Sequence, residues 1–288
     1  MAQAARIDAH LHFWRYSPAE YGWIDDRMAA LRRDFLPGDA EREMRGAGID
    51  ACVAVQVRQT IDETGWLLEL AAAHPFIAGV VGWVDLRSPD LDRQLEPVAS
   101  NPKLVGVRHI VQAEPDDFLR GKAFRDGVAR LARQGLAYDI LVYARQLPAA
   151  IDFATALPGV RLVLDHLGKP EIRAGAYDTW RRDLDRLAAL PNVWAKVSGL
   201  VTEADWERWG VEDLHRYIHA ALDSFGPERL MIGSDWPVCT VAAGYRAVID
   251  LVSTAMADWP QADRDAVLGG TARRLWNLGD VSYWSSSV

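Results

Sequence analysis

The sequence predicts an α/β fold, built as a single (β/α)₈ TIM barrel, and three observations support this prediction. The chain has 288 residues, a little more than the ~250 residues of a typical barrel. Short apolar runs alternate with longer amphipathic segments along the whole chain, and eight such runs are present. Glycine or proline ends most of the amphipathic segments, as expected where a helix stops before a strand. We therefore expect one domain over residues 1–288.

The eight apolar runs are the candidate strands. Several are apolar throughout, such as Leu162-Val163-Leu164, which is typical of parallel strands that helices cover on both faces. We expect strands at residues 6–12, 51–57, 77–85, 104–110, 137–143, 161–166, 193–198 and 229–234. The alternative is an open, doubly wound sheet. A Gly-rich turn after an early strand would favour it, and the sequence has none.

The amphipathic segments between these runs are the candidate helices. In one of them Trp66, Leu67 and Leu70 recur at the spacing that gives a helix one apolar face. The clearest helices are expected at residues 62–73, 124–134, 177–190 and 211–224. A strand–helix unit repeated eight times favours a closed barrel over an open sheet.

Composition argues against two classes of partner. The formal net charge is −8 and no block is rich in Lys or Arg, so we expect no nucleic-acid partner. The longest strongly apolar run covers residues 76–84, far short of the ~20 residues that span a bilayer.

The cysteines and the N-terminus predict the cellular compartment. Cys52 and Cys239 match no metal-binding spacing, and the N-terminus does not resemble a secretion signal. We expect a cytoplasmic protein with two reduced thiols that acts on a small molecule.

Polar residues stand where several predicted strands end, which is where a barrel carries its active site. His10 and His12 close the first strand, and they point the same way because strand side chains alternate between faces. The sixth strand leads into His166 and the eighth into Asp235. Strand ends converge in a closed barrel, so these four side chains are expected to meet. Three imidazoles and one carboxylate suit a borderline divalent ion such as Zn²⁺.

The same stretches carry a resemblance to a known family. The chain resembles the amidohydrolase superfamily over residues 7 to 278, nearly its whole length. Within the superfamily it is similar to the branch of sugar-lactonase-like and pyrone-dicarboxylate-hydrolase-like proteins. The segments that carry the resemblance are DAHLHFW at 8–14, GVRH at 106–109, DHLGKP at 165–170, KVSG at 196–199 and GSDWP at 233–237. Together they are specific for this branch.

The resemblance implies a distorted (β/α)₈ barrel and a ligand set for one divalent metal. His10 and His12 match the metal-holding pair of the first strand, and His166 and Asp235 match the later members of the set. Zn²⁺ is the expected ion, although some relatives in this branch work without metal. Superfamily members with two metals carry a bridging Lys or Glu after the fourth strand and a His after the fifth. This chain has neither, so a binuclear centre is not expected.

The implied activity is the hydrolytic opening of a small sugar lactone. Asp235 is the expected general base and His166 the second catalytic residue. A bound metal would lower the pKa of the attacking water or polarise the carbonyl; without metal, the histidines would donate hydrogen bonds to the carbonyl oxygen. Two alternatives stay open. One is a metal-dependent decarboxylase of an unsaturated or aromatic acid, and the other is a non-catalytic barrel that binds a sugar acid.

Further side chains near the strand ends are expected to contact the substrate. Arg108 and His109 match family positions that meet substrate oxygens. Lys196 stands in an apolar strand, where it is costly unless it pairs with Asp235 or Glu203 or reaches substrate. Aromatic rings suit the C–H faces of sugars. The full set of expected substrate-binding residues is Arg108, His109, Lys196, Trp14, Trp83, Tyr143 and Trp236.

Overall fold

The barrel is closed by eight parallel strands in sequence order. The computed structural model describes residues 4–279 and 281. Each strand pairs with the next one along the chain, and Leu11 bridges Trp236 in parallel, which joins the first strand to the segment that directly follows the last one. The strands are β1 (Ile7–Leu11), β2 (Ala51–Val55), β3 (Ile77–Gly82), β4 (Leu104–Ile110), β5 (Ala137–Leu141), β6 (Leu162–Leu164), β7 (Val193–Val197) and β8 (Leu230–Ile232). The predicted (β/α)₈ barrel is confirmed, and its closure excludes the open sheet.

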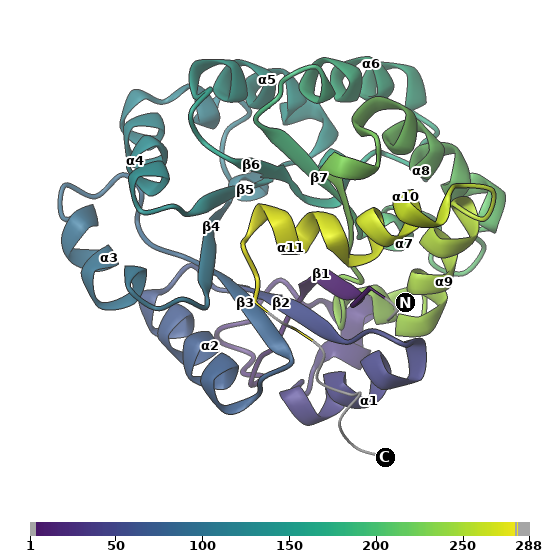
Figure 1. Ribbon diagram of the computed structural model, residues 1–288, viewed down its shortest axis with the longest axis horizontal. Coiled ribbons are helices and arrows are strands. Elements are labelled where there is room, and N and C mark those ends of the chain that lie inside the picture. The colour runs from purple at the N-terminus through teal and green to yellow at the C-terminus, as the bar shows by residue number, and fades with distance from the viewer. Residues whose placement is uncertain (1–3, 280, 282–288) are drawn as a thin grey trace.

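Helices surround the strands as an outer ring (Figure 1). The four predicted helices are present as α2, α4, α6 and α8, with ends shifted by at most two residues. Their apolar stripes pack on the barrel, where Leu67, Leu131, Leu184 and Ile218 are fully buried. The α-helices are α1 (Pro37–Ala47), α2 (Ile61–Ala73), α3 (Leu91–Ala99), α4 (Lys122–Arg133), α5 (Leu147–Ala156), α6 (Tyr177–Ala188), α7 (Leu200–Glu203), α8 (Val211–Phe225), α9 (Tyr245–Ala255), α10 (Gln261–Asp265) and α11 (Thr271–Leu275).

Most strands end two or three residues before the predicted limit. The sixth ends at Leu164 and the eighth at Ile232, although both were expected to reach the polar residues that follow. His166 and Asp235 have φ angles of 53° and 58°, in the left-handed region that strands do not use. The chain therefore leaves the sheet before these two residues. The register is also irregular within the first three strand pairs, as a distorted barrel requires.

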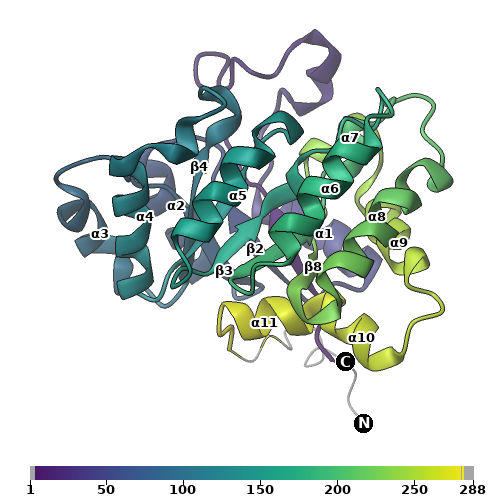
Figure 2. The same ribbon diagram turned by 90° about the horizontal axis from the view of Figure 1, so that it is seen from above.

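The two ends of the barrel are closed differently. At the N-terminal ends of the strands, α11 lies across the opening (Figure 1), and Trp276 and Leu278 pack against the apolar lower interior of the barrel. At the other end the long connection between β1 and α1 projects from the barrel (Figure 2). It includes the 3₁₀ helix η1 (Asp26–Leu31).

Within the described residues, no helix is long and apolar enough to cross a membrane.

Candidate active site

A cavity of about 580 Å³ opens at the C-terminal ends of the strands, the end at which barrels carry their active sites. It is walled by loops that follow the strands and by the connection between β1 and α1. The lining residues are His12, Trp23, Met28, Val57, Arg108, Ile110, Gln112, Ala113, Leu141, Tyr143, His166, Lys169, Thr202, Glu203, Trp206, Asp235 and Val238.

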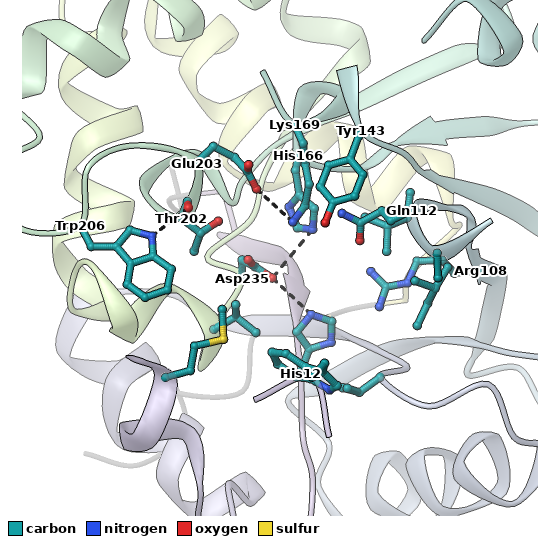
Figure 3. Close-up of a pocket in the computed structure, with 17 residues that line it drawn as sticks. His12, Arg108, Gln112, Tyr143, His166, Lys169, Thr202, Glu203, Trp206 and Asp235 are labelled. Carbon is teal, nitrogen blue, oxygen red and sulfur yellow. Dashed lines mark hydrogen bonds and ion pairs between the residues drawn. The ribbon is translucent and has the colours of Figure 1, made fainter. Parts of the chain in front are cut away.

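Three imidazoles converge on one carboxylate oxygen at the base of this cavity, and Figure 3 shows two of them, those of His12 and His166. Asp235 Oδ1 lies 3.2 Å from Nε2 of His12, 3.7 Å from that of His10 and 3.9 Å from that of His166. The Nε2 atoms of His10 and His12 are 3.2 Å apart. The four side chains come from the ends of β1, β6 and β8, so the closed barrel brings together residues separated by more than two hundred positions.

The hydrogen bonds of His12 indicate that a cation belongs in this cluster. Its Nδ1–H donates to the carbonyl oxygen of Val55 at 2.8 Å, and a carbonyl can only accept. In the neutral ring, Nε2 then carries a lone pair and faces the Asp235 carboxylate. Such a contact needs an extra proton or a metal ion between the two atoms. About 3.3 Å separates neighbouring ligand atoms around a tetrahedral zinc ion with bonds of about 2.0–2.1 Å, close to the spacings found here.

These side chains therefore fit a single divalent metal ion. His10, His166 and Asp235 each offer one ligand atom within 4.8 Å of the others, and His12 Nε2 lies beside the same carboxylate oxygen. All four side chains are buried. A nitrogen and carboxylate set of this kind suits borderline divalent ions.

Backbone geometry holds His166 and Asp235 in place. Both residues have positive φ angles, which are uncommon outside glycine and cluster at functional sites. Gly199, with φ +64°, leaves room for the His166 ring, because a Cβ there would lie 2.6 Å from Nδ1 of the histidine. Ser198 Oγ lies 2.8 Å from the same Nδ1. Around Asp235, the amide of the preceding Ser234 donates to the buried Asp8 carboxylate.

Burial sets the charge states at the base of the cavity. It lowers the pKa of His166 well below its usual value, although Asp235 opposes the shift. Burial alone would raise the pKa of Asp235, but His166, His12 and Lys169 outweigh it and hold that pKa below the ordinary value. A neutral imidazole beside an ionised carboxylate gives the site one base and one ring able to bind a metal or a substrate oxygen.

A buried network of charges lies beneath the cluster. Lys196 Nζ lies 2.5 Å from Asp139 Oδ2 and 2.9 Å from Asp165 Oδ1. Arg108 donates to the other oxygen of Asp165 at 3.1 Å. Both cations also approach His10, with Lys196 3.1 Å from Nδ1 and Arg108 3.3 Å from Nε2. Burial, helped by Lys196, lowers the pKa of His10 well below its usual value, so this ring stays neutral.

The structure changes the predicted role of Lys196. The prediction that it pairs with Asp235 or Glu203 is wrong, and it is not among the residues that line the cavity. Its side chain is fully buried below the cavity and pairs with Asp139 and Asp165 instead. Neither carboxylate was predicted as its partner, because Asp139 on β5 and Asp165 directly after β6 are both far from Lys196 along the chain.

Arg108 and His109 point to opposite sides of β4, although both were expected to reach the cavity. Arg108 lines it, whereas His109 stacks on Phe118 with ring centroids 5.1 Å apart. His109 Nε2 also lies 2.9 Å from a carboxylate oxygen of Glu114. Strand alternation therefore applies up to the end of β4, and His109 is not among the lining residues.

Three of the four aromatic residues expected around the substrate lie elsewhere. Trp14 is fully buried and its Nε1–H donates to the carbonyl of Arg33, within the connection between β1 and α1. Trp236 is buried and meets the ring of Phe35 edge to face. The indole nitrogen of Trp83 lies 3.4 Å from His109, away from the cavity. Of the four, Tyr143 alone is among the lining residues.

Sequence reasoning missed other residues of the cavity wall. Trp23 and Met28 reach it from the connection between β1 and α1, and Trp206 from the segment after α7. Nothing in their local sequence distinguishes these residues, since long connections can fold in many ways. Lys169 and Glu203 form an ion pair of 3.0 Å on the wall. Lys169 could have been found, because it follows His166 within the DHLGKP segment.

Comparison with known proteins identifies similar chains. A relative from Burkholderia multivorans named L-fucono-1,5-lactonase is 45% identical over 287 residues, which is 96% of this chain and 97% of the relative. A protein of the same name from Burkholderia ambifaria is 39% identical over 244 residues, 83% of each chain.

A solved structure and a family model agree with these relatives. The crystal structure of an amidohydrolase from Burkholderia multivorans with bound zinc is similar to this fold with a TM-score of 0.92 at 45% identity, covering 96% of this chain and 100% of that one. The family model described as amidohydrolase matches residues 7–278, the same span over which the sequence segments indicate this family. The chain therefore belongs to the amidohydrolase family.

Proposed function

We propose that this protein opens a small sugar lactone by hydrolysis and releases the corresponding aldonic acid. The observation that carries the proposal is the convergence of three imidazoles on Asp235 at the base of a cavity of about 580 Å³. The relatives named L-fucono-1,5-lactonase support the same chemistry and the sugar class of substrate. They favour the lactonase over the decarboxylase and over a barrel that only binds sugar acids.

Asp235 acts as the general base in this proposal. The water oxygen attacks the lactone carbonyl carbon while the Asp235 carboxylate takes a proton from the water. The bond between the carbonyl carbon and the ring oxygen then breaks, and Asp235 returns the proton to the ring oxygen, which becomes a hydroxyl group. The new carboxylic acid ionises in neutral solution, so each turnover releases one proton.

Arg108 stabilises the negative charge on the carbonyl oxygen of the lactone, and the other lining side chains orient the substrate. Arg108 presents its guanidinium from β4, opposite Glu203 and Trp206 (Figure 3). His12 and His166 lie beside Asp235, and Tyr143 borders the cavity on the side of Arg108. Donors fixed in a buried site stabilise an oxyanion more strongly than water does, because they need no reorganisation during the reaction.

A single divalent ion, zinc first, would be held by His10, His12, His166 and Asp235. The zinc in the similar Burkholderia multivorans structure supports this choice. When bound, such an ion would polarise a carbonyl or lower the pKa of water.

The two cysteines support a cytoplasmic location. Cys52 and Cys239 are free and buried, which suits a reducing compartment such as the cytoplasm.

Two parallel assays test the function. Acid release from a panel of aldonolactones is measured with a pH indicator, and decarboxylation of a panel of aromatic acids is measured as loss of absorbance. We expect acid release from one or more lactones and no decarboxylation. Asp235→Asn keeps the size of the side chain but removes the base, so turnover should fall about a thousandfold with the melting temperature nearly unchanged. Turnover of Asp235→Asn at the wild-type rate would contradict the assigned base. Wild-type protein inactive on every lactone would contradict the function itself.

A further inference from the structure

We propose that the Lys169–Glu203 ion pair selects the substrate. It binds neighbouring hydroxyl groups of the sugar and, because its charges cancel, disfavours lactones that carry a carboxylate. The inference rests on the proposed lactone hydrolysis and names the feature of the cavity that decides which lactones enter it.

The pair is built into the cavity wall. Lys169 Nζ lies 3.0 Å from Glu203 Oε1, and both side chains are about one-fifth exposed, at 18% and 20%. Lys169 has a φ angle of 49° in the turn after His166, and Glu203 ends the short helix α7. The carbonyl of Glu203 accepts a hydrogen bond from the amide of Arg173 at 3.0 Å. The turn after His166 and the end of α7 therefore place the two charges side by side.

The charges that line the cavity are balanced. Its two Lys or Arg residues are Arg108 and Lys169. Arg108 is paired with the buried Asp165 at 3.1 Å, and Lys169 with Glu203. A lactone bearing a carboxylate would thus find no unpaired cation among these lining residues. A protein can discriminate against a ligand by leaving its charge without a partner, as much as by attracting the competing ligand.

A sugar lactone offers what this wall can bind. Each sugar hydroxyl both donates and accepts, and an ammonium beside a carboxylate supplies donors and acceptors next to each other. Glu203 Oε1 is used by Lys169, which leaves Oε2 and the remaining ammonium hydrogens for the substrate. Trp206 lines the same cavity and lies beside Thr202, on the side of Glu203 (Figure 3).

Trp206 supplies an apolar surface beside these polar groups. Its Nε1–H donates to the carbonyl of Thr202 at 2.9 Å, so the indole nitrogen is occupied within the protein. Arg27 stacks on the ring with its guanidinium carbon 4.5 Å from the centroid. Because Trp206 is nevertheless among the lining residues, the ring still offers the cavity an aromatic surface that suits the C–H face of a sugar, while the ion pair binds the hydroxyl groups.

Two substitutions test the selection in opposite directions. The neutral probe is the aldonolactone that the wild type hydrolyses fastest, and the anionic probe is D-glucaro-1,4-lactone, measured as a competitive inhibitor. Glu203→Gln leaves Lys169 unpaired. We expect kcat/KM for the neutral probe to fall about tenfold, mainly through KM, and the anionic probe to bind about tenfold more tightly. Lys169→Gln leaves Glu203 unpaired, so both probes should bind more weakly.

Glu228→Gln is the matched control, because Glu228 pairs with Arg274 on the surface outside the cavity. This substitution should change neither kcat/KM for the neutral probe nor the binding of the anionic probe. Melting temperatures show whether each variant is folded. If one of the two cavity variants does not fold, the change in binding predicted for the other variant still tests the proposal. The proposal is overturned if folded Glu203→Gln binds D-glucaro-1,4-lactone no more tightly than the wild type, or if folded Lys169→Gln binds the neutral probe as tightly as the wild type. Wild-type protein inactive on all lactones would instead refute the proposed function.

Discussion

At the scale of single residues, the site depends on buried charges that balance one another. Lys196 is fully buried and lies between Asp139 and Asp165. Burial raises the pKa of Asp139 to about 6 even though Lys196 opposes the shift. Lys196, His10 and Arg108 together outweigh burial at Asp165 and hold its pKa well below the usual range. Lys196 therefore keeps two carboxylates ionised in the middle of the barrel.

Lys196→Met should destabilise the protein by about 3 kcal/mol, since removing one partner of a buried ion pair leaves an uncompensated charge. Asp139 loses its cation, whereas Asp165 keeps Arg108. Adding Asp139→Asn to the variant removes the orphaned charge and should restore part of the loss. Urea unfolding at neutral pH measures both effects. Equal stability of Lys196→Met and wild type would show that the network contributes nothing.

At the scale of elements, the connection between β1 and α1 is tied to the loop between β2 and α2. Glu20 in the connection pairs with Arg58 in the loop, and Glu63 in the first turn of α2 organises that loop. The Glu63 carboxylate accepts hydrogen bonds from the amides of Val57 and Arg58 at 3.1 and 2.6 Å. Val57 lines the cavity, so Glu63 supports one part of the wall from behind.

The titration of Glu63 should make stability depend on pH. Burial raises its pKa from the ordinary 4.5 to about 7, although Arg58 opposes the shift. The folded state therefore holds a proton that the unfolded chain releases. The resulting stabilisation is complete below pH 4.5 and is lost as the pH rises through about 7. A shift of this size corresponds to about 3 kcal/mol.

Glu63→Gln should remove this dependence, because an amide does not titrate here and its oxygen still accepts the two backbone hydrogen bonds. Urea unfolding at about pH 5 and at about pH 8, which lie on either side of the folded pKa, compares the two proteins. Glu69→Gln, on the exposed face of the same helix, should behave like the wild type. Identical pH profiles for Glu63→Gln and wild type would refute the assignment.

At the scale of the whole molecule, the cluster joins distant parts of the barrel. His10 lies near the end of β1 and His12 directly follows it, His166 follows β6 and Asp235 follows β8. Backbone hydrogen bonds already link β1 to the segment after β8, from Asp235 N to the His10 carbonyl and from His12 N to that of Trp236. An ion held by these residues would add a second cross-link between the ends of the barrel.

Binding of zinc should therefore raise the melting temperature. Protein treated with a chelator and then given zinc at about a hundredfold its Kd should gain about 2.7 kcal/mol, or roughly 5 °C or more for a chain of this size. The His12→Asn variant should lose most of this gain. Magnesium in place of zinc should produce little of it, because magnesium prefers oxygen ligands. Metal content after gel filtration gives an independent reading. A melting temperature unaffected by zinc would argue against a metal site.

The sequence was sufficient wherever a local pattern decided the outcome. Apolar runs and amphipathic segments predicted the eight strands and the closed barrel, because strand and helix periodicity are properties of neighbouring residues. Polar residues at the ends of those runs predicted that His10, His12, His166 and Asp235 lie together, since parallel strands converge at one end, and the distances confirm that they do. Family segments in the same places pointed to the amidohydrolases.

Only the tertiary structure decided which side chains surround the cavity and which charges pair. Trp14 and Trp236 are buried among other aromatic rings, while Trp23 and Trp206 reach the cavity from segments with no regular period. Lys196 meets carboxylates from two other strands of the ring. Such contacts join residues far apart in the chain, so they depend on how strands are ordered around the barrel and how long connections fold back over its end. Short-range periodicity carries no information about either.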